Sequence, residues 1–381
     1  MKVLQRYFAS EIIRAVFFVL MAFLALFAFF DLMNELKSVG RQDYGLTQAF
    51  IYVFLSLPGY AYELLPIAAL IGTIYVLAQY AARSEFTIMR VSGMSTTKAA
   101  LILGKIGIVF ALMTFVFGEF IAPRASDLAQ KVKLSSQGRA VSQEFRSGMW
   151  AKDMIRESQG AAPAGTRFLN AREIRPDGQL QGVRIYEFDR DFRLKTLIVA
   201  DSGSYQGANT WQLQTVSETR FLMPEGDVLA AASDPATGIE TESMVSRSLV
   251  SEITPELLAV LFSDPDRMSA YDLSAYSRHL AENKQSSERY EIAFWKKMTY
   301  PFAVFVMMAL ALPFAYLHVR AGGVSLKIFT GIMIGVSFHL VNNLFSHIGL
   351  LHTWPPFATA VLPGLLFLLF ALSALMWVQR H

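Results

Sequence analysis

Apolar residues form six long blocks along this chain, and one large polar stretch divides them into two groups of three. The blocks are Ile12–Met33, Gly45–Ala82, Ala99–Ile121, Met298–Leu317, Ile328–Phe345 and Pro356–Val378. A helix that crosses a membrane needs about 20 mainly apolar residues. The pattern therefore predicts an α-helical membrane protein with six transmembrane helices in a 3+3 arrangement around one inserted domain.

Charged residues are concentrated in the polar stretch. Residues 124–297 hold 46 of the charged side chains, whereas residues 328–379 hold none. Charged residues make up 17% of the chain and hydrophobic residues 53%, while soluble domains average about 25% charged residues. This composition excludes a soluble cytosolic enzyme.

The basic residues predict which way the helices face. With the N-terminus in the cytoplasm, nine Lys and Arg residues lie in the short inner segments, and only Lys37 and Arg41 lie in the short outer ones. Short loops rich in Lys and Arg stay cytoplasmic. We therefore expect both termini in the cytoplasm and residues 124–296 on the opposite side. The absence of Cys suits an oxidising periplasm there.

The inserted stretch has the pattern of β-structure. Short runs rich in β-branched and aromatic residues predict strands at 183–188, 195–200, 210–216 and 218–223. Short strands at this spacing favour a sandwich or jelly roll, and from Thr254 a helical pattern leads back to the membrane. The expected domains are 1–123 with helices 1–3 and a surface helix at about 83–95, 124–296 with the β-jelly-roll-like part and a helical return, and 297–381 with helices 4–6.

No motif for enzyme chemistry accompanies this organisation. The sequence lacks a G-x-x-x-x-G-K-[ST] nucleotide loop and the common zinc-protease, hydrolase and dinucleotide motifs. His339, His347 and His352 are spaced by eight and five residues, which places no two on one helical face, so we favour interfacial polar residues over metal ligands. We expect no catalytic residue, metal or bound cofactor. The net charge of +3 gives no reason to expect nucleic acid.

Three charged residues are candidates for a substrate path. Glu63 interrupts the second apolar block, near the outer hydrocarbon boundary and between Pro58 and Pro66. Lys37 and Arg41 lie at a similar depth, at the outer end of helix 1. Ionisable residues at such depths mark polar paths. The alternative is an ordinary interfacial acid paired with a snorkelling lysine.

The inner connection 83–95 has the pattern of a short amphipathic helix. Phe86 and Met89 share one face, while Glu85 and Arg90 supply charge. A short surface helix with exposed apolar residues suits docking into a groove on a cytoplasmic partner. The alternative is a connector that contacts no partner.

Several motifs resemble those of a known family. Segments 66–72, 84–89 and 92–95 are similar to the signature of the LptF/LptG permeases, the membrane subunits of an ATP-driven lipopolysaccharide exporter. Segments 148–153, 253–257 and 295–301 are more similar to the LptG branch than to the LptF branch. The resemblance covers essentially the whole chain.

The resemblance implies a function in the inner membrane of a Gram-negative bacterium. With an LptF-like permease, the chain would form a cavity open to the outer leaflet, which lipopolysaccharide enters between helix 1 of one subunit and helix 5 of the other. The G-x-x-x-G of helix 5, Gly331 and Gly335, permits close helix packing there. The jelly roll would pass the lipid to an LptA-like periplasmic bridge, and an LptC-like single-helix protein would insert at the gate.

The resemblance also implies roles for individual residues. Glu85, with Phe86, Met89 and Arg90, matches a coupling helix that docks on an LptB-like ATPase dimer, and that dimer uses the ATP and Mg²⁺. Lys37 matches a basic position that contacts substrate phosphates, and Arg41 lies nearby. Relatives can carry basic residues where this chain has Asp31, Ser38 and Gly59.

Two other functions fit parts of the sequence. A mechanotransmitting ABC permease moves no substrate through its membrane part, but it usually has four helices. A membrane-anchored binding or sensor protein needs an output domain, and the short inner connections of this chain cannot hold one.

Overall fold

The computed structural model describes residues 2–40, 44–91, 93, 95–136, 148–155, 164–175, 178–222, 238–260, 264–316 and 323–380. Within these residues, six helices are long and apolar enough to cross a membrane. They span 6–38, 46–82, 96–133, 288–315, 324–351 and 356–378, and the strands lie in the sequence between the third and the fourth.

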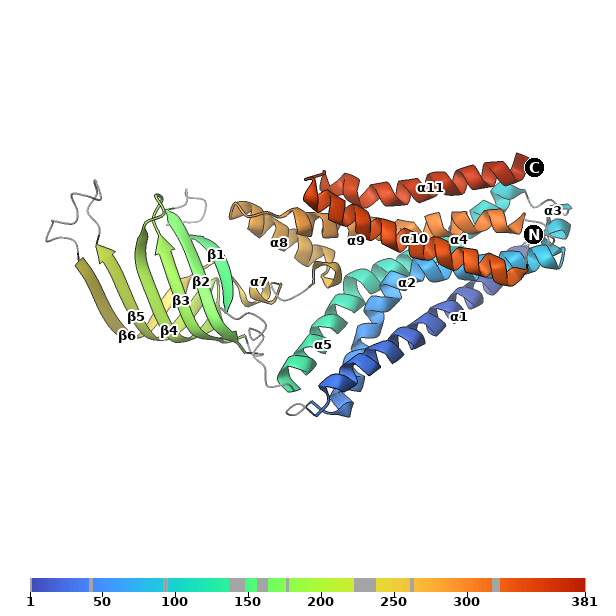
Figure 1. Ribbon diagram of the computed structural model, residues 1–381. Helices are drawn as coiled ribbons and strands as arrows, with labels where there is room; N and C mark the ends of the chain where they lie inside the picture. The colour runs from blue at the N-terminus through green and yellow to red at the C-terminus, as the bar shows by residue number, and fades with distance from the viewer. Residues whose placement is uncertain are drawn as a thin grey trace.

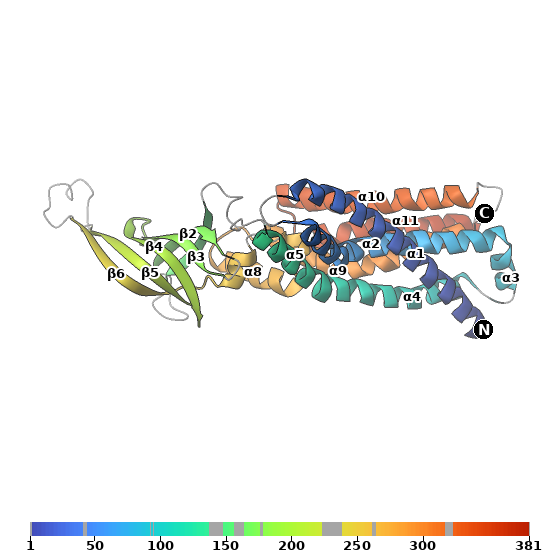
Figure 2. The same ribbon diagram turned by 90° about the horizontal axis from the view of Figure 1, so that it is seen from below.

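The two ends of the helical bundle differ in what they carry. The N-terminus, the C-terminus and the short helix α3 (Glu85–Val91) lie together at one end, and the β-sheet lies beyond the other (Figures 1 and 2). We call these the α3 end and the sheet end. Three further helical segments connect the sheet to the bundle: α5 (Ala122–Ser136), α7 (Pro255–Val260) and α8 (Ala270–Glu282).

Two helices occupy the centre of the bundle. They are α2 (Leu46–Ala82) and α9 (Glu288–Ala311), and α9 continues into the 3-10 turn η5 (Leu312–Ala315). Of the most apolar window of α2, 83% is buried, against 11% in α11 (Pro356–Arg380). The other peripheral helices, α1 (Lys2–Glu35) and α10 (Val324–Leu351), also leave most of their apolar surface uncovered. These outer faces are therefore available to lipid or to other chains.

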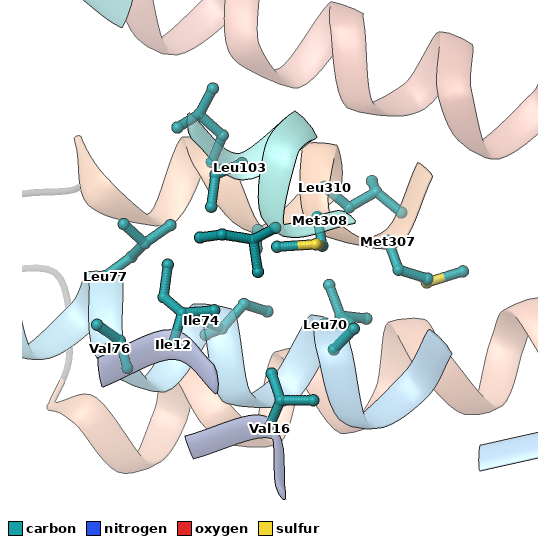
Figure 3. Packing of buried hydrophobic residues seen from close by; sticks show 14 of the residues in the cluster. Ile12, Val16, Leu70, Ile74, Val76, Leu77, Leu103, Met307, Met308 and Leu310 are labelled. Atoms are coloured by element: carbon teal, nitrogen blue, oxygen red, sulfur yellow. The ribbon is translucent and has the colours of Figure 1, made fainter. Parts of the chain in front are cut away.

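The core of the bundle contains aliphatic, aromatic and methionine side chains, most of them from four helices. Figure 3 shows Ile12 of α1, Leu70 of α2, Leu103 of α4 (Thr96–Val116) and Met307 of α9 converging on one region. Lipid is as apolar as these side chains, so close packing rather than escape from water holds such helices together.

The third membrane span is one continuous helical rod with an irregular turn. It comprises α4, the π-helical turn η2 (Phe117–Ile121) and α5. The rod continues past residue 123, where we expected the inserted domain to begin. π-Helical turns are rare and often lie at functional sites, and this one carries Glu119.

The strands form one antiparallel sheet in which each strand pairs with its neighbours in the sequence. They are β1 (Met149–Ile155), β2 (Gly165–Ile174), β3 (Leu180–Phe188), β4 (Leu194–Gly207), β5 (Thr210–Leu222) and β6 (Gly238–Val250). Trp211 is fully buried in its core, and its indole N–H donates to the carbonyl of Ile253 at 2.7 Å. The described strands do not confirm the two-layered jelly roll that we expected.

One feature of the sheet differs from the sequence prediction. The separate strands expected at 210–216 and 218–223 are a single strand, β5, as far as Leu222. Glu218 interrupts the apolar pattern, but it is buried and forms ion pairs with Arg220 and Arg247. Thr215 has a φ of +53° and is skipped in the pairing on both sides, but the register is the same before and after it, so the strand continues through this irregularity.

Candidate functional site

The two described candidates for a substrate path, Lys37 and Glu63, have different neighbours. Lys37 is exposed in the 3-10 turn η1 (Leu36–Ser38), and its Nζ lies 3.4 Å from Oδ1 of Asn34. Arg41 lies outside the described residues. Glu63 lies on α2, and the charges that act on it most strongly are Arg267 and Asp266. The pairing of Glu63 with Lys37 that the sequence suggested is therefore wrong.

Polar contacts fix the sheet end of α1. Glu35 is buried, accepts a hydrogen bond from the Tyr44 hydroxyl at 2.9 Å, and pairs with Lys133 of α5 at 2.6 Å. Burial, followed by the hydrogen bond to Glu35, raises the pKa of Tyr44, so the phenol stays protonated and donates. Asp31, at a position where relatives can carry Lys, accepts a hydrogen bond from Tyr60 of α2 at 2.7 Å. These contacts join α1 to both α2 and α5.

A second set of contacts joins the bundle to α8. The carboxylate of Glu119 accepts hydrogen bonds from the backbone N–H groups of Ala270 at 2.8 Å and Tyr271 at 3.3 Å, in the first turn of that helix. Lys297 of α9 is buried, donates to the carbonyl of Met268, and lies 5.6 Å from the centre of the Tyr62 ring. A helix N-terminus attracts negative charge, so Glu119 holds α8 against the membrane helices.

The apolar face that we predicted for the coupling helix points inwards. Phe86 and Met89 do share a face, but both are buried in the bundle core, and the Phe86 ring contacts Tyr316 edge-on at 5.1 Å. The exposed apolar side chains of α3 are instead Ile88, at 64%, and Val91, at 85%. Phe86 and Met89 therefore position α3 and offer no surface for a partner.

The polar residues of α3 are described only in part. Glu85 is half-buried at the start of the helix, and its carboxylate lies 3.8 Å from Nη1 of Arg83. The side chain of Arg90 is outside what the structure describes. Glu85 therefore remains accessible next to the exposed Ile88.

The glycine pair of α10 packs within the chain. A Cβ on Gly331 would lie 2.7 Å from Cδ1 of Ile74, and one on Gly335 would lie 2.8 Å from Cγ2 of Ile67. Both contacts are with α2, so the absence of side chains lets α10 lie close to the central helix. The packing role predicted for these glycines agrees with this geometry, and a role at a gate stays a prediction.

The described geometry places a short helix at one end of a bundle of membrane-type helices and a sheet at the other. Comparison with known proteins identifies the family. The family described as lipopolysaccharide export system permease LptF/LptG matches residues 6–377. The chain belongs to this permease family.

Relatives of the chain include two proteins named as lipopolysaccharide export system permease protein LptG. The protein from Escherichia coli K12 is 29% identical over 375 residues, which cover 98% of each chain. The protein from Haemophilus influenzae is 29% identical over 366 residues, which cover 96% of each chain. The similarity therefore extends through the membrane helices and the sheet domain alike.

Sequence reasoning missed the residues that hold the sheet end together. Glu35, Lys133 and Lys297 were counted only as charges, although all three make contacts between elements that are far apart in the chain. Glu119 had the clearest signal, because an acid inside an apolar block needs a partner. The sequence could not show that this partner is the backbone of residue 270.

Proposed function

We propose that this chain is the permease subunit of an ATP-driven exporter that extracts lipopolysaccharide from the outer leaflet of a bacterial inner membrane. The observation that carries the proposal is the opposite placement of α3 and the sheet in a chain that belongs to the LptF/LptG family. One end offers a surface for an energy source and the other a domain that can receive the lipid. The family match argues against the sensor and the mechanotransmitting alternatives.

In this proposal the α3 end is cytoplasmic and the sheet end periplasmic, with three spans on either side of the inserted domain. An LptB-like ATPase dimer docks on α3 and uses ATP and Mg²⁺, because the permease has no nucleotide-binding loop of its own. The chain is then a component of a transporter and catalyses no reaction itself.

The membrane cavity forms between this chain and an LptF-like permease. Support comes from α1, whose exposed side chains include Phe18, at 76%, and Phe29, at 57%. A lipid with many acyl chains needs a wide apolar surface, and removing it costs about 0.8 kcal/mol for each buried CH₂ group that becomes exposed. ATP hydrolysis in the partner supplies this energy by closing the cavity. An LptC-like helix inserts at its gate.

The sheet passes the lipid onwards to an LptA-like bridge. Among the described strands, β6 pairs only with β5, so its other edge is open over 13 residues. An open edge of this length suits the addition of a strand from a partner domain. Closure of the sheet into a jelly roll belongs to this proposal as well.

The proposal is tested by purification and reconstitution. The full-length chain should co-purify in mild detergent with an ATPase and with a second six-helix permease. In liposomes that contain lipopolysaccharide, this complex should release the lipid to an added bridge protein only when ATP and Mg²⁺ are present. A complex of full ATPase activity that leaves lipopolysaccharide in the liposomes would contradict the export function.

A further inference from the structure

Two cavities meet on one side of α9, and they differ in character. The first, of about 250 Å³, is lined by charged residues of α2, α9 and the turn η4 (Pro265–Arg267) and by polar residues of α10. The second, of about 230 Å³, lies between α9, α10 and α11 and is lined mainly by apolar side chains. Lys296, Tyr300 and Asn342 line both cavities. The two are therefore neighbours with a shared wall, one mainly polar and the other mainly apolar.

Two groups of opposite charge line the polar cavity without a partner among the described residues. The Glu63 carboxylate and the Arg267 guanidinium form no ion pair within 4 Å and no side-chain hydrogen bond there. The other charged groups that line it have partners, because Lys296 pairs with Asp266 at 3.3 Å, Lys297 donates to a backbone carbonyl, and Asp264 accepts from the backbone N–H of Asp266 at 3.3 Å. The cavity can therefore accept one ammonium group at Glu63 and one phosphate at Arg267.

A buried polar group marks the junction of the two cavities. Asn342 is 6% exposed, and its side-chain amide has no hydrogen-bond partner among the described residues. The amide can donate two hydrogen bonds and accept others, so a ligand with carbonyl oxygens at this level would satisfy it.

The apolar cavity continues from this junction along the membrane helices. Its wall includes Phe302, Val306 and Phe338, with Gly364 and Leu368 from α11 on the other side. A Cβ on Gly364 would have no neighbour within 4 Å, so the groove is open at that point. A single flexible hydrocarbon chain would fit in such a groove.

We propose that this site binds one glycerophospholipid with an ethanolamine headgroup. The ammonium group contacts Glu63, the phosphate contacts Arg267, the ester carbonyls accept hydrogen bonds from Asn342, and one acyl chain lies between α9 and α11. Glu63, Arg267 and Asn342 all line the polar cavity, and Asn342 also lines the apolar one, so headgroup and acyl chain can be held side by side. This lipid is a bound component of the permease and is distinct from the transported substrate.

Size and charge select this occupant. Pockets for small molecules measure about 300–1,000 Å³, and the two cavities together lie in that range, which suits one headgroup and part of one chain. A lipid with many acyl chains and several phosphates needs a wider apolar space, and more cations than Arg267, the one unpaired cation among the described residues that line the cavity. An anionic phospholipid without an amine would leave Glu63 unpaired beside its own negative charge.

Native mass spectrometry of the purified full-length chain, with the subunits that co-purify, tests the proposal. After delipidation, the protein is mixed with dioleoylphosphatidylethanolamine, dioleoylphosphatidylglycerol or lipopolysaccharide. We expect one phosphatidylethanolamine to remain bound, with at least fivefold lower occupancy by phosphatidylglycerol. Glu63→Gln should abolish this preference, because the amide no longer favours the ammonium group.

Filling the groove provides the matched test. Gly364→Leu should lower phosphatidylethanolamine occupancy at least fivefold, and the fold should survive because leucine favours a helix more than glycine does. Gly104→Leu on α4 is the control, since a Cβ there also has no neighbour within 4 Å and the site is elsewhere. A photoactivatable acyl chain should crosslink to α9, α10 or α11 in the control and not in Gly364→Leu.

Three outcomes would overturn the proposal. They are equal occupancy in wild type and Gly364→Leu, loss of every phospholipid on delipidation with none rebinding, and displacement of phosphatidylethanolamine by an equal concentration of lipopolysaccharide. The last result would assign the groove to the transported lipid. A wild-type complex that retains phosphatidylethanolamine without exporting lipopolysaccharide would support this site while contradicting the proposed function.

Discussion

Oε2 of Glu119 lies 2.8 Å from the backbone nitrogen of Ala270, so a membrane helix holds the first turn of a helix that leads from the sheet. The two residues are 151 positions apart. Ser269 provides the usual cap for α8, because its hydroxyl accepts from the N–H of Asp272 at 3.0 Å. Glu119 accepts hydrogen bonds from the N–H groups of Ala270 and Tyr271, the two residues before Asp272. A residue from another part of the fold therefore completes the cap.

We predict that Glu119→Ala loosens this joint without unfolding the bundle. Loss of a cap costs about 0.5–2 kcal/mol, so amide hydrogen exchange in residues 270–282 should become about tenfold faster, at about 1.4 kcal/mol for each factor of ten. Lipopolysaccharide release should fall while ATPase activity remains. Glu11→Ala is the control, because the ion pair of Glu11 with Arg14 is exposed. Unchanged exchange in Glu119→Ala would show that the contact contributes nothing.

On α3, exposed and buried apolar residues should give different phenotypes. Ile88→Asp and Val91→Asp should lose the co-purifying ATPase while the melting temperature of the permease stays within a few degrees. Phe86→Ala should instead lower the melting temperature, since removal of a buried Phe costs about 3–5 kcal/mol. Normal ATPase binding by Ile88→Asp and Val91→Asp would exclude α3 as the docking surface.

The Glu85→Arg variant should also fail to co-purify with the ATPase, because the substitution reverses a half-buried charge next to the exposed Ile88. The variant replaces an acid that faces Arg83 with a second base, so local repulsion adds to the loss. Assembly and ATPase stimulation at the wild-type level would favour an inert connector.

Lys37 should contact the transported lipid. Lys37→Glu is expected to weaken crosslinking and export more than Lys37→Ala, because the carboxylate repels substrate phosphates in addition to removing a cation. Arg14→Glu, on an equally exposed part of α1, is the control. A photo-crosslinker at position 37 that captures no lipopolysaccharide, in a complex that is transporting, would remove α1 from the path.

The membrane helices of this fold were easier to predict from the sequence than the strands, because a long apolar run is a stronger pattern than the alternation within a strand. The six membrane helices follow from apolar length alone, and their bounds differ from the prediction by only a few residues at most ends. The strands β1, β2 and β6 were not predicted. β6 carries mostly exposed residues, and β2 is buried on both faces over most of its length, so neither shows a clear alternation of buried and exposed positions. Such strands acquire their structure from pairing, which a local pattern does not contain.

The site residues were harder to predict for the same reason. Phe86 and Met89 have the spacing of an amphipathic helix, but the spacing cannot tell whether the apolar face meets a partner or the chain's own core. Gly331 and Gly335 were recognised because the motif is local. The packing role of Gly72 was passed over, although among the described glycines of the membrane helices it is the one at which a Cβ would lie closest to another backbone.

Gly72 should tolerate no side chain. A Cβ there would lie 2.7 Å from the backbone nitrogen of Val16 on α1, and backbone atoms cannot rotate away as a side chain does. Gly72→Ala should therefore lower the melting temperature and reduce the yield of inserted protein. Gly104→Ala is the matched control and should be neutral or stabilising, because open space surrounds that position. If Gly72→Ala were as stable as Gly104→Ala, α1 would have to move away from α2 at little cost to make room for the new methyl group.

Membrane topology can be tested with single cysteines, since the natural chain has none. Cysteines at Ser38 and Gln206 should react with an impermeant maleimide added to the periplasm, and one at Thr97 should not. Gln206 is preferred to the neighbouring Gly207, whose φ of +90° would strain any side chain. Labelling of a cysteine at position 97 in intact cells would show that the topology is the reverse of the one predicted.

The length of α2 has a mechanical consequence. Its 37 residues form one helix of about 55 Å that continues through Pro58 and Pro66 and ends three residues before α3 begins. A rod enclosed by its neighbours along most of its length can tilt but can hardly bend, so it behaves as a lever with the packed core as its pivot. A small rotation imposed on α3 would reach the far end of the rod enlarged by the ratio of the two arms, and no relay of side-chain rearrangements would be needed in between.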